Sequence, residues 1–473
     1  MARSAKSCLA FASGAGRIGM AHLGIGLGLA CFALIPLACR PGYAGPGHGR
    51  NFPLSPAAVR PFALGRPDAV ILITGSNNGR LEVCNCAGEM AGGLSRRSGL
   101  FQSYRAAFSH VLAIDAGGAF RIEPNDPRND YILRAYRLMG YDATVLGDSE
   151  WSASNDHLKA LLGDGGGNYL STTVSPADEA VKLPLQTVIK RDWGPIKLAA
   201  ISDIPRPSLL FFSAERIKAL KFASPASLPA QADQLKREGN MLIVVVHCDD
   251  AAAEAAARDL RADLVIRRHT TRSDPHMQRA GGAAIVKVGG PDTVGVVAVK
   301  FTAAGAVAAM EYRLETVDGH WPVDSRVMAV YQAYAHAAMV KALDAERTKG
   351  LDYAPSSECG RCHAAALKAW QSGPHNRAYR TLVKAGRTGD PDCLTCHTSG
   401  FGTEKGFYTL DKTPAMAGVN CQDCHRFNID EHLRKGFKFP KANEDVCTTC
   451  HTPTTDPSFS YALKAGKVRC PRN

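Results

Sequence analysis

Short runs of β-branched and aliphatic residues alternate with amphipathic stretches from Asp68 to about residue 270. Each apolar run ends in polar residues, which is typical of a buried strand. The runs span 69–75, 110–117, 143–148, 197–203, 241–250 and 262–269. Between them, residues 95–110 and 127–141 have the residue spacing of helices. This alternation predicts an α/β domain in which a sheet is buried between helices.

The pattern changes after residue 280. Three apolar runs, 283–290, 293–301 and 308–317, follow one another without helices, so we expect the last strands to pair antiparallel. A helix is predicted over about Asp324 to Arg347, and apolar periodicity fades beyond Cys359. The expected organisation is an α/β domain, a linking helix and a separate C-terminal domain. These divisions cover residues 68–320, 321–350 and 351–473.

The first 44 residues resemble an export signal. A basic start is followed by the apolar stretch 20–39, and the small residues "GYA" precede Gly45. An uncleaved anchor helix is the alternative. Residues 45–67 are rich in Pro, Gly and Arg and are expected to be a linker. No later stretch is apolar enough to span a bilayer, so we expect a periplasmic protein without a stable membrane span after signal removal. The alternatives are a membrane-anchored protein facing the periplasm and an extracellular protein.

Eight of the 15 cysteines lie in four C-x-x-C-H motifs. Two thiols at this spacing form thioether bonds to haem, and the adjacent histidine is an axial ligand of the iron. Zinc sites are the alternative, but zinc does not require a histidine next to the second cysteine in every motif. The sequence therefore predicts four covalently bound haem c groups. Their binding residues are Cys359, Cys362, His363, Cys393, Cys396, His397, Cys421, Cys424, His425, Cys447, Cys450 and His451.

Four irons have eight axial positions, and the motif histidines occupy four of them. His375 and His432 lie among the motifs and are predicted to be distal ligands. His336, on the linking helix, is a third candidate, with a core or surface residue as the alternative. One iron then remains without a histidine. It is either five-coordinate or takes His320, Met416 or another residue.

The C-terminal segment resembles the tetrahaem cytochrome c554 family over roughly residues 350–455. The matching features are "SSECGRCHAAALKAWQSGPHNRAY", "CLTCH", "GVNCQDCH" followed by His432, and "CTTCH". The resemblance implies a mainly α-helical multihaem cytochrome c domain with closely stacked haems, largely with two histidine ligands each, one haem often being five-coordinate. It also implies electron transfer to redox partner proteins. It does not identify a substrate.

The α/β domain resembles the 5′-nucleotidase branch of the calcineurin-like metallophosphatases over about residues 68–317. That resemblance implies an αββα sandwich with two metal ions at the strand ends. This chain lacks most of the ligands: "GSNNG" (75–79) replaces Asp-x-His, Gly118 stands where the bridging Asp belongs, and Thr271 replaces a histidine. We therefore expect phosphohydrolase activity to be absent. A single metal ion, bound with help from Asp115 and Asp148, is left open.

The stretch "CNCAGEMAGGLSRR" resembles a subgroup of nucleotidase-like proteins that includes selenoproteins. Further cysteine and histidine residues follow two later strands, at the sheet edge where α/β sites form. The sequence thus suggests a thiol redox or soft-metal site, with an ordinary disulfide or unpaired thiols as alternatives. The candidate residues are Cys84, Cys86, Cys248, His247 and His269.

The formal net charge of +12 marks a basic protein, but no Lys/Arg cluster interleaved with aromatic residues indicates nucleic-acid binding. The favoured function is electron transfer by an exported tetrahaem cytochrome, with the phosphatase-like domain serving docking or redox chemistry. One alternative is an oxidoreductase acting on small nitrogen or sulfur species at an open haem or the cysteine cluster. A metallophosphoesterase is the other.

Overall fold

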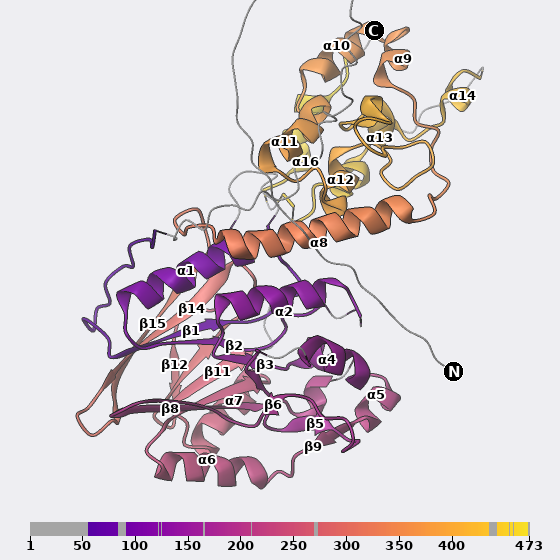
Figure 1. Ribbon diagram of the computed structural model, residues 1–473. Coiled ribbons are helices and arrows are strands. Elements are labelled where there is room, and N and C mark those ends of the chain that lie inside the picture. Colours follow the sequence, from indigo (N-terminus) through magenta and orange to yellow (C-terminus); the bar gives the residue numbers. More distant parts are fainter. Residues whose placement is uncertain are drawn as a thin grey trace, which may run out of the picture. The chain divides into compact units, whose positions relative to one another are not determined.

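The structure is a computed structural model of the 473-residue chain. It describes residues 55–83, 91–121, 123, 125–163, 166–209, 211–268, 273–434, 442–453, 455–456 and 458–471. The predicted signal segment, residues 1–44, lies outside these ranges. The described residues all belong to one compact unit, Arg50–Asn473 (Figure 1).

The first sheet has seven strands in the order β15-β14-β1-β2-β3-β4-β6. Strands β1 to β6 in this sheet pair parallel, whereas β14 pairs antiparallel with both β1 and β15. Every residue of β1 is buried, as expected for a central strand covered on both faces. The strands are β1 (Ala69–Thr74), β2 (Val111–Asp115), β3 (Ala143–Val145), β4 (Tyr169–Leu170), β6 (Leu185–Gln186), β14 (Thr293–Phe301) and β15 (Val307–Thr316).

The second sheet has six strands in the order β12-β13-β11-β10-β8-β7, and β5 pairs with β9 in a separate ribbon. Strands β8, β10, β11 and β13 are parallel neighbours. The second-sheet strands are β7 (Ile189–Trp193), β8 (Ile196–Asp203), β10 (Met241–His247), β11 (Leu264–Arg268), β12 (Gln278–Ala280) and β13 (Ala283–Lys287). The ribbon consists of β5 (Val174–Pro176) and β9 (Leu220–Phe222).

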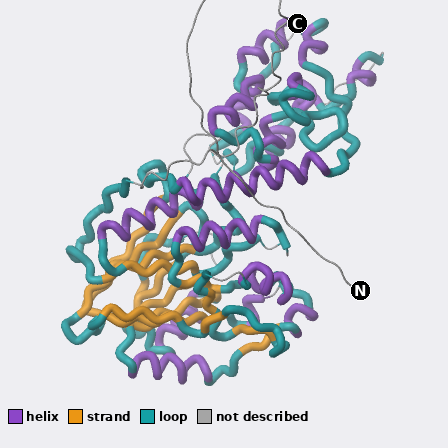
Figure 2. The backbone as a smooth tube through the Cα atoms, in the orientation of Figure 1, coloured by secondary structure: helices purple, strands orange, loops and turns teal. Residues whose placement is uncertain are grey.

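Helices cover the outer faces of both sheets (Figure 2). Successive side chains of β10 divide between two apolar clusters, Ile243 and Val245 in the larger and Val244 and Val246 in the smaller. This division follows from the two-residue period of a strand, and it means that β10 has a core on each face. The predicted αββα sandwich is therefore confirmed. Its helices are α1 (Leu94–Ala107), α2 (Arg128–Met139), α3 (Asp148–Trp151), α4 (Asn155–Leu162), α5 (Ala214–Lys218), α6 (Ser227–Arg237) and α7 (Asp250–Asp259), with the 3-10 turn η1 (Arg206–Leu209).

The long helix α8 (Ser325–Asp344) joins the sandwich to the C-terminal segment, as the sequence predicted. It contacts α1 and α2 of the sandwich and α12 of the C-terminal segment. Asp324 caps its start by accepting a hydrogen bond from the Arg326 amide, and its carboxylate also accepts one from Ser98 of α1 at 2.8 Å. This shared carboxylate fixes the start of α8 to the sandwich.

The C-terminal segment consists of short helices and loops with little apolar interior. Its buried cluster in the described residues holds Leu382, Cys393, Leu394, Phe407 and Met416. A segment this long needs more buried apolar surface to fold alone, and the four haem groups predicted from the sequence would supply it. Its helices are α9 (Ser356–Gly360), α10 (Ala364–Ser372), α11 (Ala378–Ala385), α12 (Pro391–His397), α13 (Cys421–His425), α14 (Ile429–His432), α15 (Glu444–Thr448) and α16 (Tyr461–Lys464). The 3-10 turns are η2 (His375–Arg377), η3 (Pro414–Met416) and η4 (Ala465–Val468).

Two expectations need correction. Strand β13 pairs parallel with β11, because the short strand β12 forms the antiparallel edge hairpin with β13 instead. The described part of the predicted linker, residues 55–67, packs on the sandwich: Phe62 is buried, and the Arg313 guanidinium lies 4.0 Å from its ring centroid. These residues therefore extend the sandwich. In the part of the chain that the structure describes, no helix is both long and apolar enough to cross a membrane.

Candidate haem-binding site

The four C-x-x-C-H motifs share one local geometry. Each begins within a helix, namely α9, α12, α13 or α15. In the first and last motifs the histidine amide donates to the carbonyl of the first cysteine at 2.9 Å, from His363 to Cys359 and from His451 to Cys447. One helical turn therefore brings both thiols and the imidazole of a motif close together. This is the arrangement that covalent attachment of haem requires.

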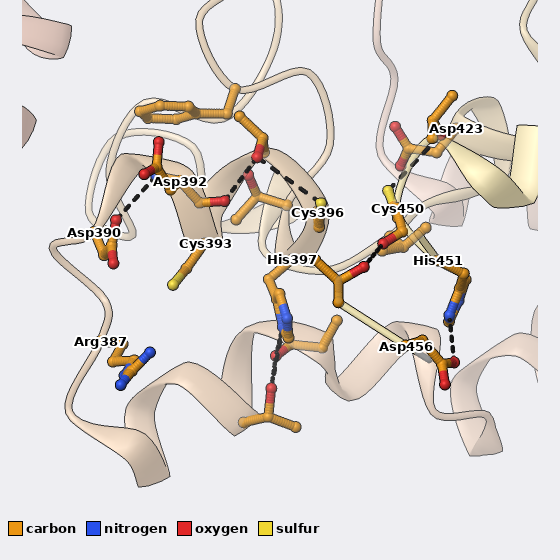
Figure 3. Close-up of a pocket in the computed structure, with 18 of the residues that line it drawn as sticks. Arg387, Asp390, Asp392, Cys393, Cys396, His397, Asp423, Cys450, His451 and Asp456 are labelled. Carbon is orange, nitrogen blue, oxygen red and sulfur yellow. Dashed lines mark hydrogen bonds and ion pairs between the residues drawn. The ribbon is translucent and has the colours of Figure 1, made fainter. Parts of the chain in front are cut away.

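A cavity of about 1510 Å³ is lined by residues of the second, third and fourth motifs. Pockets for a single small molecule measure about 300–1,000 Å³, so this space has room for more than one. Motif residues supply much of its wall, as Figure 3 shows for Cys393, Cys396, His397, Cys450 and His451. The residues present therefore fit large, flat, apolar groups anchored by sulfur.

Among the described residues of the C-terminal segment, two pairs of imidazoles lie close together. The ring centroids of His363 and His432 lie 5.9 Å apart, and those of His375 and His451 lie 6.3 Å apart. Two imidazoles that bind one metal ion from opposite sides, each with a metal–nitrogen distance of about 2 Å, have their ring centres about 6 Å apart. Both spacings thus match a metal ion between the rings.

Burial lowers the pKa of His375 and of the motif histidine His425, which favours the uncharged form that binds iron. Desolvation lowers the pKa of His375, and the nearby His451 lowers it further. Desolvation also lowers the pKa of His425, with a smaller contribution from His363. A lowered histidine pKa leaves the ring uncharged at neutral pH, so its nitrogen lone pair is available to a metal.

Two of the motif histidines have defined partners at Nδ1. That atom of His397 lies 2.8 Å from the Ala378 carbonyl and 3.1 Å from the Thr381 hydroxyl. In His451 it lies 2.9 Å from a carboxylate oxygen of Asp456 (Figure 3). Contacts at Nδ1 orient the ring so that Nε2 faces a metal.

Thiols of different motifs meet in pairs. The pKa of Cys359 is raised mainly by the neighbouring Cys421 thiol, and that of Cys450 mainly by the neighbouring Cys396 thiol, so the two sulfurs of each pair lie close together. The helix of the third motif, α13, also contacts that of the fourth, α15. These sulfurs become thioethers when haem is attached, so the thiol–thiol interaction itself is then lost. The contacts are informative because they show that the two motifs of each pair lie close together. They place haem-binding sites next to one another.

The sandwich contributes to the wall of the same cavity. Loop residues Asn78 to Val83, which follow β1, line it together with residues of α12. Tyr331 of α8 donates a hydrogen bond to Asp390, and Arg128 of α2 lies 3.3 Å from Asp392. The second motif, on α12, is therefore held directly against the sandwich.

The strand ends of the sandwich, where the resemblance implies two metal ions, contain an arginine instead. Arg268, at the end of β11, forms an ion pair with Asp148. A Cβ at position 118 would collide with its guanidinium, and the positive φ of Gly118 (75°) also favours glycine there. Burial is the largest single influence and raises the pKa of Asp148, but the charges of Arg268 and His247 and the hydrogen bonds from Arg268 and the Ser149 amide together outweigh it, so the pKa lies below its ordinary value. A guanidinium in this position repels metal cations.

Two neighbouring carboxylates accept hydrogen bonds from backbone amides, so they are occupied within the protein. Glu150 accepts hydrogen bonds from the amides of Gly118 and Phe120, each at 3.0 Å, and Asp115 accepts one from Gly117. Burial raises the pKa of both carboxyl groups. Among the described residues, no group of three or more His, Cys, Asp or Glu side chains could hold a metal ion. The described residues at these strand ends do not fit a dinuclear centre.

The proposed thiol or metal site is only partly within the described residues, because Cys84, Cys86 and His269 lie outside them. His247 is buried, and its Nε2 lies 2.7 Å from the Ala116 carbonyl. Cys248 packs against the smaller apolar cluster on the other face of the sheet, as expected for successive residues of an extended chain. Burial raises the pKa of its thiol to about 12. The structure does not bring His247 and Cys248 together.

The remaining ligand candidates lie in different surroundings. His336 is exposed on α8. His320 lies 3.0 Å from the Ala58 carbonyl, against the sandwich. Met416 is buried in the small apolar cluster, where its sulfur lies 3.6 Å from the Asn420 amide nitrogen.

Sequence reasoning missed two residues that shape these sites. Arg268 lies in a strand run that the sequence predicted. Its neighbour Arg267 has the same side chain but pairs with Asp250, so the sequence alone does not show which arginine reaches Asp148. Asp456 lies five residues after His451, and no motif marks it. A charged residue in an otherwise buried strand end was the only available signal for Arg268, and Asp456 had none.

Comparisons by sequence match part of the C-terminal segment to known proteins. Residues 358–426 match the family model described as cytochrome c554 and c-prime. Cytochrome c-554 of Nitrosomonas europaea is 29% identical over 130 residues, which cover 20% of this chain and 55% of that protein. The C-terminal segment is similar to a c-type cytochrome. The match spans little more than half of that relative's length.

Solved structures match the sandwich in fold. The sulfate thiohydrolase SoxB of Thermus thermophilus superposes with a TM-score of 0.50 and 18% identity, over 58% of this chain and 61% of its own. A 5′-nucleotidase precursor, also from Thermus thermophilus, has the same TM-score and identity, over 74% of this chain and 73% of its own. At this identity the likeness shows the fold alone, which is the phosphatase-like sandwich that the sequence predicted.

Proposed function

We propose that this chain is an exported c-type cytochrome that carries four covalently bound haem c groups and transfers electrons between redox partner proteins. The observation that carries the proposal is the recurrence of four C-x-x-C-H motifs, the last three of which contribute to the wall of a cavity of about 1510 Å³. Bound haem iron supplies reversible one-electron chemistry. The chain supplies sulfur anchors, axial imidazoles and an apolar enclosure.

The facing imidazoles support an assignment of axial ligands. We assign His363 and His432 to one iron and His375 and His451 to another, on the basis of their centroid separations of 5.9 and 6.3 Å. His432 and His375 are then the distal ligands, as the sequence predicted. The distal positions opposite His397 and His425 stay open, with His336 as the predicted candidate for one of them.

The contacts between motifs support a spatial order of the haem sites. The thiol pairs link the first motif to the third and the second to the fourth, and α13 contacts α15. The proposed order is therefore 359–363, 421–425, 447–451 and 393–397. Neighbouring sites at thiol contact distance permit electrons to pass along the whole series, and the last of them lies against the sandwich.

The sandwich is proposed to support the haem-bearing segment and not to hydrolyse phosphate esters. Its Arg268–Asp148 ion pair lies where metal ions would clamp a phosphate group, and Tyr331 and Arg128 hold α12. An oxidoreductase acting on small nitrogen or sulfur species, at an open iron or at the cysteines near β1, is the alternative. The oxidoreductase alternative is retained because two distal positions have no histidine assigned to them among the described residues.

Haem stoichiometry tests the proposal. The chain is matured in a host that attaches haem c and exports the protein, and haem is counted per polypeptide by the pyridine haemochrome assay and by intact mass. We expect four haems, and three in a Cys393→Ala/Cys396→Ala variant. Mature protein without a Soret band would contradict the proposal. A high-spin ferric EPR signal that shifts with cyanide favours the oxidoreductase, and an all-low-spin spectrum favours electron transfer.

A further inference from the structure

The imidazoles of two neighbouring haem sites are held by different groups. The Nδ1 atom of His397 contacts the uncharged Ala378 carbonyl and Thr381 hydroxyl, at 2.8 and 3.1 Å. The Nδ1 atom of His451 instead contacts a carboxylate oxygen of Asp456 at 2.9 Å. Both contacts orient a ring, but only the second brings a negative charge to it.

Asp456 is largely buried, and charged and polar side chains contact its carboxylate. Its residue is only 7% exposed, and the Lys464 ammonium lies 3.2 and 3.1 Å from its two carboxylate oxygens. Ser458 donates a hydrogen bond to the same carboxylate at 3.2 Å. Phe459 stacks on the His451 ring with centroids 4.6 Å apart and an angle of 15° between the planes. The carboxylate and the ring are thus both fixed.

A carboxylate in this position changes the ligand as well as its orientation. Accepting the Nδ1–H bond makes the imidazole a stronger electron donor at Nε2, and such partners tune a bound metal. The added negative charge stabilises the more positive ferric state over the ferrous state. The ammonium of Lys464 opposes this effect, because it neutralises part of the carboxylate charge.

We propose that Asp456 is a positioning residue that lowers the reduction potential of the haem attached at Cys447 and Cys450, and that Lys464 limits this effect. The inference rests on the proposed function, since it requires haem at that motif. It assigns opposite effects on the reduction potential to the two members of one ion pair. Substituting each member should therefore shift the potential in opposite directions.

The experiment uses the full-length mature holoprotein. Asp456→Asn keeps an oxygen that accepts the Nδ1–H bond but loses the charge, and Lys464→Gln leaves the carboxylate without its counter-charge. Spectroelectrochemical titration resolves the midpoint potentials, and EPR records the low-spin ferric signals. We expect Asp456→Asn to raise one of the four potentials and Lys464→Gln to lower the same one, with a change in one EPR signal. Asp456→Glu should restore the wild-type potential in large part.

Thr381→Val is the matched control, because it removes one of the two neutral contacts at His397 and leaves Asp456 in place. It should not move the component that responds to Asp456→Asn. Four haems with unchanged potentials in both charge variants would overturn the inference while leaving the proposed function intact. If Asp456→Asn loses a haem, Lys464→Gln decides: a lowered potential supports the inference and an unchanged one overturns it. A haem count near zero in the wild type contradicts the proposed function itself.

Discussion

Arg268 forms an ion pair with Asp148 at the strand ends of the sandwich, and its guanidinium lies against Gly118. The resemblance to metallophosphatases implies a bridging aspartate at position 118, but Arg268 leaves no space for a side chain there. The glycine and the arginine therefore depend on each other. Restoring one metal ligand alone would not restore a metal site.

We expect the wild-type protein to show no hydrolysis of a generic phosphate monoester, with or without added Zn²⁺ or Mn²⁺. The reason is that the positive charge of Arg268 lies where a cation would bind. Release of phosphate and the content of zinc and manganese are measured on the same sample. Hydrolysis that EDTA abolishes would contradict this expectation and revive the metallophosphoesterase.

Replacing Asp148 by Asn should destabilise the sandwich by about 3 kcal/mol at neutral pH, because it leaves the mostly buried Arg268 without its partner. Since the pKa of Asp148 is lowered from 3.8, the ion pair stabilises the fold above that pH, and the benefit is lost as pH falls through the folded-state pKa. The difference between variant and wild type should therefore shrink in acid. Urea unfolding followed by circular dichroism at several pH values measures it.

Asp192→Asn is the control for that comparison. Asp192 is 67% exposed and lies 3.9 Å from Lys197, so its ion pair is solvated. We expect a change below about 0.5 kcal/mol. Equal losses in the two variants would show that the Arg268–Asp148 pair contributes no more than a surface contact.

Removing the hydroxyl of Tyr331 tests the attachment of α12 to the sandwich. Tyr331 and Asp390 are both buried, so Tyr331→Phe leaves a buried carboxylate without this donor and should cost about 1–3 kcal/mol. Calorimetry of the holoprotein measures the loss. Tyr334→Phe serves as the control, because in the described residues its hydroxyl makes no hydrogen bond, although its ring packs on Tyr131.

His375→Ala should convert one of the four haems to a high-spin ferric form, because the imidazole facing His451 would be lost. The EPR spectrum and the cyanide-binding stoichiometry record the change, and we expect one additional cyanide-binding site. His276→Ala, at an exposed position of the sandwich, should leave both unchanged. An unchanged spectrum for His375→Ala would show that another group binds opposite His451.

The sequence predicted the longer helices and strands well. The buried strand runs, the helices 95–110 and 127–141 and the linking helix agree with β1, α1, α2 and α8 to within a few residues. These elements are long and have a clear period, so local pattern determines them. The short strands β4, β6 and β12 were missed, because two or three residues show no period and are specified by their partners in the sheet.

The candidate sites show the same limit. A C-x-x-C-H motif contains its own anchors within five residues, so it can be recognised without a fold. The pairing of His375 with His451 depends on segments far apart in the chain, and so does the contact between Arg268 and Gly118. Residue spacing also does not show which charged side chain contacts an axial imidazole. The contact between Asp456 and His451 became apparent only in the structure.

The small apolar cluster of the C-terminal segment has a consequence for biogenesis. Leu382, Leu394, Phe407 and their few neighbours cannot hold this segment folded by themselves, whereas the sandwich has its own large core. We therefore expect newly made chains to acquire a folded N-terminal body while the C-terminal segment remains accessible for haem attachment. Failure of that attachment would leave a stable body with a tail that proteases remove.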